Sequence, residues 1–391
     1  SSSKVRTSLT LNEGESIFVA FDTGKPTFRK EVLETFNKVI TDYFANPSSI
    51  HKEGLESGQL LKRAREQIAS FLNVKDDEII FTSGASESNN FAIKGVAFKY
   101  KNRGNHLITS KTEHPSVLNV FKQLENEFGF EVTYLDCNKD GCIDVETLSK
   151  YIRDDTILVS LMHVNNETGA ITNIDEIGKF IKKNYHKCIF HTDITQSVGK
   201  IDVKLDNVDL ASMSAHKIYG FKGSGLLVKK EKISLLPLIV GGSQEDGNRA
   251  GTSNVAYAVC LAKALRLQME DKEKDYQNIS YLNSYVRENI KGINGVLINS
   301  SLNSSPYILN LSISNKKSAI ISDYLGSKGI SVSNTSACGS KEISSYVIEN
   351  MYPNTNRSKS SFRISMCKYT TKEDIDELIK VLKTINEDII G

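Results

Sequence analysis

A lysine near the middle of the chain has the residue type and the surroundings of a carbonyl-binding site. Lys217 follows an apolar run that ends at Ser214, and Gly220, Gly223 and Gly225 come soon after it. Glycines let the backbone turn tightly and let a ligand approach it closely. Desolvation lowers the pKa of a lysine and frees its amine to attack aldehydes. Lys217 is therefore a candidate nucleophile rather than one more solvated surface charge.

An aspartate upstream of Lys217 could complete such a site. The apolar run that begins at Cys188 leads to Asp193, and Gln196 comes three residues later. Open α/β sheets place ligand-binding groups at the carboxyl ends of their strands. A carboxylate that keeps a pyridine nitrogen protonated and a lysine that forms a Schiff base are the protein's share of pyridoxal phosphate chemistry. The pair Asp193 and Lys217 therefore indicates pyridoxal 5'-phosphate as the cofactor.

The segment Gly84-Ala85-Ser86 offers a place for an anion. It stands between the strand-like run Glu78–Phe81 and a helical pattern that extends to about Lys99. The first N–H groups of a helix lack partners within the helix, and the helix dipole is positive at that end, so phosphates bind there. Ser86 would serve equally well as a plain helix cap. Both interpretations stay open on this pattern alone.

Two segments carry a resemblance to a known family. His191-Thr-Asp-Ile-Thr-Gln-Ser197 and Ser214-Ala-His-Lys-Ile-Tyr-Gly-Phe-Lys-Gly223 resemble the cofactor motifs of cysteine desulfurases of the NifS/IscS-like group. The resemblance runs from about Ile17 to the C-terminus and implies the fold of class V aminotransferases, which is fold type I of the pyridoxal phosphate enzymes. It implies a large α/β domain over 17–260, with a mainly parallel seven-stranded sheet between helices. A smaller α+β domain is expected over 261–391, with residues 1–16 flexible or packed on it.

The same resemblance implies the cofactor-binding residues. Ser86, next to Ala85, would hold the cofactor phosphate, and Thr252 would reach that phosphate from the other subunit of a homodimer. His114 would stack on the pyridine ring and move protons, as a neutral imidazole can. The expected cofactor-binding set is Ala85, Ser86, His114, Asn166, Asp193, Gln196, Ser214, His216, Lys217 and Thr252. A metal site is not expected.

Cys338 is the expected sulfur-carrying nucleophile. It lies in the small, polar segment Ser331-Val-Ser-Asn-Thr-Ser-Ala-Cys338, and a nucleophilic thiol must be exposed. The segment resembles the cysteine loop of the longer-loop desulfurases, in which the thiol attacks the substrate sulfur and becomes a persulfide. Arg363 matches the arginine that grips the substrate α-carboxylate, and Asn166 would assist it. The resemblance thus implies conversion of L-cysteine to L-alanine, with Cys338, Lys217 and His114 as catalytic residues and an unidentified sulfur-acceptor protein.

Departures from the family pattern leave other functions open. The segment Ala20-Phe-Asp22-Thr-Gly-Lys-Pro26 replaces both threonines of the family's first motif, and Ser243 replaces a glycine of another. A selenocysteine lyase or another class V aminotransferase-type enzyme is one alternative. A weakly active subunit that needs a partner protein is a second. A mobile thiol argues against plain transamination, which does not use one.

The order of apolar runs predicts alternating strands and helices, which favours a mainly parallel sheet covered on both faces. Strands are expected near 17–21, 78–81, 107–110, 131–135, 157–162, 189–191, 208–214 and 225–228, with helices near 29–44, 55–72, 85–99, 115–128 and 173–184. The charged stretch 254–292 is expected to form two helices with a break. Strands near 307–313, 330–333 and 362–366 and helices near 317–328 and 371–389 follow.

Composition excludes several other classes of protein. The 391 residues are 39% hydrophobic and 25% charged, which is typical of a globular protein, and the net charge of +2 gives no footprint for nucleic acid. Apolar runs all fall short of the ~18 residues that span a bilayer. The six cysteines lack metal-binding spacing and are expected to be free thiols, as in a cytoplasmic protein.

Overall fold

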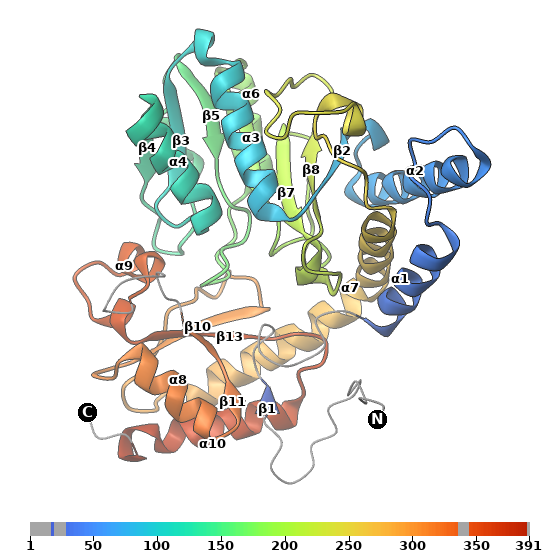
Figure 1. The fold of residues 1–391 in the computed structure, drawn as a ribbon. Coiled ribbons are helices and arrows are strands. Elements are labelled where there is room, and N and C mark those ends of the chain that lie inside the picture. The colour runs from blue at the N-terminus through green and yellow to red at the C-terminus, as the bar shows by residue number, and fades with distance from the viewer. Residues whose placement is uncertain (1–16, 19–28, 335–343, 389–391) are drawn as a thin grey trace.

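The computed structural model describes residues 17–18, 29–334 and 344–388 (Figure 1). The expectations for residues 1–16, for the segment Asp22–Pro26 and for Cys338 lie outside these residues. Of the strand expected near 17–21, the described part is β1 (Ile17–Phe18).

A seven-stranded, mainly parallel sheet forms the larger part of the molecule. Its order is β2 (Ile79–Thr82), β8 (Gly225–Lys229), β7 (Leu210–Ser214), β6 (Ile189–Asp193), β5 (Thr156–Ser160), β3 (His106–Ser110) and β4 (Glu131–Leu135). From β7 to β4 the neighbouring strands are parallel, whereas β8 runs antiparallel to both of its neighbours. All residues of β3, β5, β6 and β7 are buried, as expected where helices cover both faces. The predicted fold class is confirmed.

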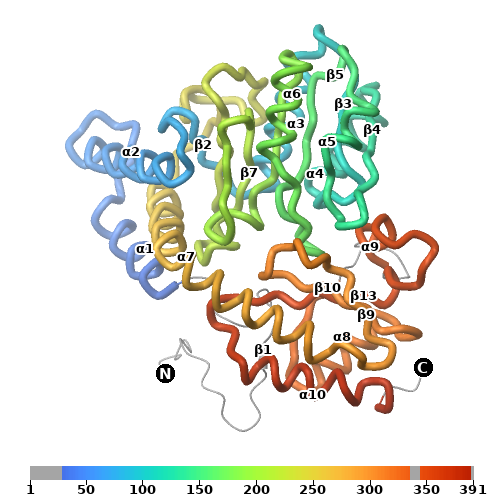
Figure 2. The backbone as a smooth tube through the Cα atoms, turned by 180° about the vertical axis from the view of Figure 1, so that it is seen from behind, coloured from blue at the N-terminus to red at the C-terminus, as the bar shows by residue number. Residues whose placement is uncertain are grey.

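Adjacent residues of each strand point into two different hydrophobic layers, because side chains alternate along a strand. Ile80, Leu107 and Leu158 pack with α3 (Ala85–Lys99) and α4 (Pro115–Phe128) on one face. Their neighbours Ile79, Ile108 and Val159 pack with α2 (Lys52–Leu72), α6 (Ile174–Asn184) and α7 (Val255–Ile290) on the other. Figures 1 and 2 show these two faces in turn.

A second, antiparallel sheet lies beside the carboxyl ends of the large sheet's parallel strands. Its order is β12 (Ser333–Asn334), β13 (Ser361–Ser365), β10 (Ile308–Ile313) and β9 (Val296–Ile298). Helices α8 (Ser318–Ser327) and α10 (Lys372–Asp388) pack with it in one hydrophobic cluster. The remaining elements are α1 (Lys30–Asp42), α5 (Val145–Ser149), α9 (Tyr346–Met351), β11 (Ile330–Ser331), which pairs with β1, and short 3-10 helices at Asp76–Glu78, Lys101–Arg103, Ala215–Ile218, Gln244–Gly247 and Arg357–Lys359.

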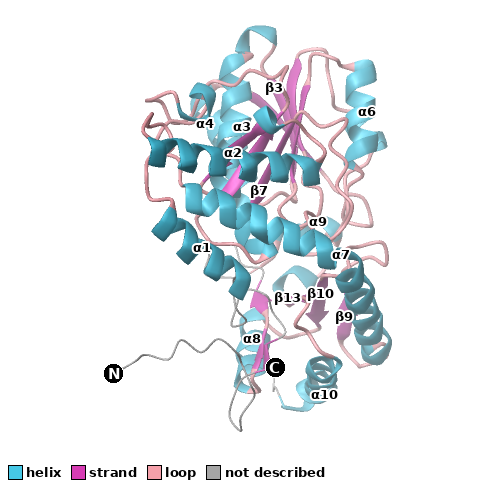
Figure 3. Ribbon diagram, turned by 90° about the vertical axis from the view of Figure 1, so that its right-hand side faces the viewer, coloured by secondary structure: helices cyan, strands magenta, loops and turns pink. Residues whose placement is uncertain are grey.

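One long helix joins the two sheets. Helix α7 (Val255–Ile290) is continuous over 36 residues, so the prediction of two helices with a break was wrong. The sequence between its ends contains no proline or glycine, and charged side chains do not interrupt a helix. Its first half packs in the large hydrophobic core and its second half in the core of the small sheet (Figure 3). A domain boundary at residues 260 and 261 would fall inside this helix, and the division into domains stays a prediction.

None of the helices in the described residues could span a membrane, because none is both long enough and sufficiently apolar.

Candidate active site

A cavity of about 250 Å³ lies where the large sheet meets the small one. Asp193 and Ser214 are the last residues of β6 and β7, and Arg363 comes from β13 of the small sheet. The cavity thus lies at the carboxyl ends of parallel strands, where open α/β sheets bind ligands. Its lining residues are Ala85, Ser86, His114, Ser116, Met162, Val164, Asn166, Asp193, Thr195, Gln196, Ser214, His216, Lys217 and Arg363. Among the described residues, every one expected at the site lines this cavity except Thr252.

Hydrogen bonds fix the orientation of the Asp193 carboxylate. One oxygen accepts a hydrogen bond from the Asn89 side-chain amide at 2.9 Å, and the other accepts one from the Thr195 backbone N–H at 3.0 Å. The Asn89 amide also donates to the Ser116 hydroxyl at 2.9 Å. Asp193 is buried, so the carboxylate presents a defined negative charge to the cavity instead of being screened by water.

His114 is held as a neutral ring at the start of α4. Its Nδ1 accepts a hydrogen bond from the Ser116 N–H at 3.1 Å, which leaves the proton on Nε2. Burial lowers the pKa of His114, and the positive charges of Lys217 and Arg363 lower it further, against the opposing effect of Asp193. A neutral imidazole with a positioned proton can both stack on an aromatic ring and transfer that proton.

Lys217 lies in the 3-10 helix that directly follows β7. The residue at the end of that strand, Ser214, accepts a hydrogen bond from the Ala85 N–H at 2.7 Å, which ties the lysine-bearing corner to the beginning of α3. Gly84, before α3, has a φ of 148°. Lys217 and the anion-attracting helix end, where Ser86 carries its hydroxyl, therefore open into one cavity.

Arg363 reaches the cavity from the small sheet. Its guanidinium donates to the backbone oxygen of Asn166 at 2.8 Å and to the Ser333 hydroxyl at 3.1 Å. The guanidinium, which is half-buried, thus links the two sheets at the cavity. A planar, always charged donor group in this place suits a carboxylate ligand.

Two buried residues near the cavity were missed by sequence analysis. Lys200 donates a hydrogen bond to the Gln196 side-chain oxygen at 3.1 Å, which turns the Gln196 amide nitrogen away from Lys200. Glu113 accepts from the Ser110 hydroxyl at 2.8 Å and from the Met162 N–H at 3.0 Å, and burial raises its pKa to about 8. The spacing of four residues between Gln196 and Lys200 was a detectable signal, because this stretch is a run of turns with backbone hydrogen bonds from the Val198 N–H to Ile194 and from the Ile201 N–H to Ser197. The burial of Glu113 had no sequence signal.

The residues that follow segment 335–343 attach to the wall of the same cavity. The Tyr346 hydroxyl donates to the backbone oxygen of Glu113 at 2.6 Å, directly beside His114. The neighbouring Ser345 hydroxyl donates to the Glu167 carboxyl, directly beside Asn166. Helix α9 is thereby joined to two of the segments that line the cavity.

Thr252 does not line this cavity in a single chain. It lines a separate hollow of about 190 Å³, together with Ser83, Arg249 and Tyr257. The His163 N–H donates a hydrogen bond to the backbone oxygen of Asp193 at 3.0 Å, and the His163 backbone oxygen accepts one from the Thr172 N–H at 2.9 Å.

The described cysteines are free thiols, namely Cys137, Cys142, Cys188, Cys260 and Cys367. Burial raises the pKa of Cys137 and of Cys260 to about 12, and it also raises the pKa of Cys142 and Cys188. Thiols of this kind are poor nucleophiles at neutral pH, because the thiolate is the reactive form.

Comparison with known proteins gives this site a family. The model of the aminotransferase class-V family matches residues 21–378. A protein named cysteine desulfurase IscS, from Dictyoglomus turgidum, is 43% identical over 364 residues, which cover 92% of both chains. A solved NifS-like protein has a TM-score of 0.89 at 32% identity, over 96% of this chain and all of its own. The structure titled SspA in complex with cysteine has a TM-score of 0.79 at 34% identity, over 91% of this chain and 100% of its own.

The chain belongs to the aminotransferase class-V family and, within it, to the cysteine desulfurases. Enzymes of this family use pyridoxal phosphate, and the cavity fits that cofactor. A helix N-terminus for the phosphate, a neutral ring for stacking, a fixed carboxylate and a lysine all line one space.

Proposed function

We propose that the chain is a pyridoxal phosphate-dependent L-cysteine desulfurase, which converts L-cysteine to L-alanine and holds the released sulfur as a persulfide on Cys338. The observation that carries the proposal is the convergence of Lys217, Asp193 and Arg363 on one cavity in a chain closely related to cysteine desulfurases.

The residues of the large sheet would bind and tune the cofactor. Once bound, pyridoxal phosphate withdraws electrons from the substrate α-carbon. Lys217 would hold the cofactor through its amine, and the same amine would move a proton at the substrate α-carbon. Asp193 would keep the pyridine nitrogen protonated through its negative charge, and His114, with its proton at Nε2, would cover the ring.

The remaining cofactor contacts are assigned to the residues that line the same cavity. Ser86 binds the phosphate at the N-terminus of α3, and Gln196, oriented by Lys200, donates to the ring oxygen. The other proposed contacts are Ala85, Asn166, Ser214 and His216.

Substrate binding falls to Arg363 and Asn166. The guanidinium of Arg363 has five N–H donors, and a bidentate pair with the α-carboxylate would orient the amino acid. Because Arg363 already donates to the Asn166 backbone, the two residues keep their relative position before substrate arrives.

Sulfur transfer is assigned to Cys338. Its thiolate attacks the substrate sulfur, and the sulfur–carbon bond breaks with its electron pair left on the carbon side. That carbon then takes up a proton and leaves as the methyl group of alanine. The substrate sulfur stays on Cys338 as the outer atom of a persulfide, from which an acceptor protein removes it.

A homodimer in the cytoplasm is part of the proposal. Thr252 is exposed, and large apolar side chains nearby in sequence are exposed as well, up to 84% for Val240. Such a surface favours association. The exposed residues Leu236, Leu238, Ile239 and Val240 form one continuous run with only Pro237 between them. Free thiols in the described part of the chain fit a reducing compartment.

The test uses the purified protein with pyridoxal phosphate and L-cysteine. We expect a yellow protein that releases alanine and, with a reducing thiol present, sulfide in equal amounts. Release of pyruvate or a keto acid without sulfide would contradict the proposal. A requirement for added partner protein before any alanine appears would favour the partner-dependent alternative.

A further inference from the structure

The turn that leads to Thr252 has an unfavourable backbone. Glu245 and Asp246 have φ angles of 49° and 53°, and Gly247 follows at 76°. Residues other than glycine rarely adopt this left-handed backbone conformation, and two such residues in succession persist only where surrounding contacts hold them. The contacts that hold this turn are therefore informative about its purpose.

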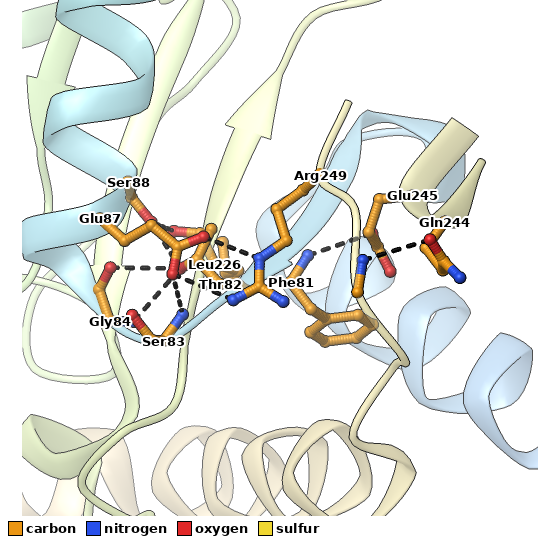
Figure 4. A network of polar contacts seen from close by, with 11 residues as sticks. Phe81, Thr82, Ser83, Gly84, Glu87, Ser88, Leu226, Gln244, Glu245 and Arg249 are labelled. Carbon is orange, nitrogen blue, oxygen red and sulfur yellow. Dashed lines mark hydrogen bonds and ion pairs between the residues drawn. The ribbon is translucent and has the colours of Figure 1, made fainter. Parts of the chain in front are cut away.

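A partly buried ion pair holds the beginning of the turn. Arg65, from α2, donates two parallel hydrogen bonds to the Glu245 carboxylate at 2.7 and 2.8 Å. The same carboxylate accepts the Phe81 N–H of β2 at 3.2 Å (Figure 4), and its side chain is only 4% exposed. This fork, a pair of parallel hydrogen bonds between one guanidinium and one carboxylate, fixes the orientation of the Glu245 side chain as well as its distance from Arg65.

A second ion pair holds the end of the segment against the phosphate-binding turn. Arg249 donates to the Glu87 carboxylate at 2.8 Å, and that carboxylate also accepts the Ser83 N–H at 2.8 Å (Figure 4). Within the segment, the Gln244 side chain accepts the Gly251 N–H at 3.2 Å. Both ends of the segment are thus attached to the β2–α3 region of its own subunit.

The attached segment leads directly to Thr252. It comes directly after the fixed segment, is exposed, and lies outside the cavity of its own chain. From this arrangement we infer that Arg65 and Glu245 are positioning residues that hold Thr252 ready for the cofactor phosphate of the other subunit. This role rests on the homodimer proposed above.

Mixed dimers test the inference directly. In one dimer, a subunit with both Lys217→Ala and Glu245→Gln is paired with an unchanged subunit. In the other, a subunit with Lys217→Ala alone is paired with one that carries Glu245→Gln. Each dimer keeps a single Lys217, so the visible absorbance of cofactor bonded to that lysine reports one site. The measurement is the rate at which this absorbance is lost after dilution into cofactor-free buffer.

The reference is a dimer of one Lys217→Ala subunit and one unchanged subunit. In the first dimer we expect the absorbance to be lost about tenfold faster than in this reference. In the second we expect the reference rate, because the charge-assisted fork acts on the cofactor site of the opposite subunit. Equal rates in the two dimers, or faster loss only in the second, would overturn the inference. Arg65→Lys, which keeps the charge but loses the fork, should repeat the pattern if Glu245→Gln does not fold. Glu231→Gln is the matched control, since its ion pair with Lys75 is 63% exposed on both sides.

The outcomes separate this inference from the proposals on which it rests. Light scattering that finds the unchanged protein monomeric would reject the homodimer and, with it, the positioning role. Failure to release sulfur from cysteine would reject the desulfurase proposal and leave the cofactor-loss rates unaffected, because that measurement involves no sulfur.

Discussion

Lys217 should be essential both for holding the cofactor and for turnover. Replacement with alanine should abolish the visible absorbance of bound cofactor and all alanine release, because this amine opens into the cavity beside Asp193. Absorbance spectra of the purified variant with added pyridoxal phosphate check this. Lys222→Ala removes an exposed lysine nearby and should behave like the parent. Turnover at the parent rate by Lys217→Ala would contradict the site.

Cys338 should be needed for persulfide formation but not for cofactor binding. Cys338→Ser should keep the cofactor absorbance and its change on addition of cysteine, yet form no persulfide, because serine cannot take up the sulfur. Mass spectrometry of the parent after cysteine treatment should place one additional sulfur atom on Cys338. Cys367→Ser is the control, since that thiol is buried. An additional sulfur on Cys367 would show that the nucleophile is misassigned.

The attachment of helix α9 to the cavity wall should affect the rate of persulfide formation. Tyr346→Phe removes the hydrogen bond to the Glu113 backbone and should slow persulfide formation about fivefold, the effect of about 1 kcal/mol for one hydrogen bond. The cofactor absorbance should not change. The physical reason is that Tyr346 lies eight residues after Cys338 in the sequence and its hydrogen bond fixes the start of α9 to the cavity wall.

The control lies at the other end of the same helix. The Tyr352 hydroxyl donates to the Asn299 backbone at 2.9 Å, away from the cavity-lining residues, so Tyr352→Phe should leave persulfide formation at the parent rate. Equal slowing by both variants would mean that α9 acts only through general stability. Single-turnover labelling of the persulfide measures each rate.

How far the sequence predicted the structure also depends on the element. The parallel strands and their ligand-binding ends were predictable, because Asp193 and Lys217 follow apolar runs that only a buried strand explains. The continuity of α7 was not, because its charged residues suggested an interruption that the missing prolines and glycines should have argued against. Glu113 and the fork between Arg65 and Glu245 depend on contacts between distant segments, which no local pattern reports.

For the whole molecule, stability should have a maximum near pH 6.5. Burial lowers the pKa of His163 and of His191 to about 4, so between about pH 6.5 and 4 the unfolded chain binds two protons that the folded protein does not. The free energy of unfolding therefore falls as the solution is acidified through this range. Burial raises the pKa of Glu113 to about 8, so the folded protein keeps a proton that the unfolded chain loses above about pH 4.5.

The two effects oppose each other below pH 6.5. Burial also lowers the pKa of His106 and His114 and raises that of Glu167 and Asp275, so four histidines stand against three carboxyl groups. Between pH 6.5 and 8 the effect of Glu113 remains, and stability should decline with rising pH. Urea unfolding at a series of pH values measures this. Glu113→Gln does not titrate and should weaken the decline on the alkaline side, while the acid side keeps its direction. An unchanged alkaline decline in that variant would show that Glu113 is not its source.

The strand order of the small sheet has a consequence for how the protein is made. Strand β13 is synthesised after β9, β10 and β12, yet it lies between β12 and β10 and carries Arg363. While the ribosome is still translating the region before residue 361, the seven strands of the large sheet are already complete in sequence, but the small sheet lacks a central strand. Domains fold as units during synthesis. A chain released early from the ribosome would therefore possess Lys217 and Asp193 without Arg363, the residue proposed to bind the amino acid, and it would expose the pairing edge of β10 to other chains.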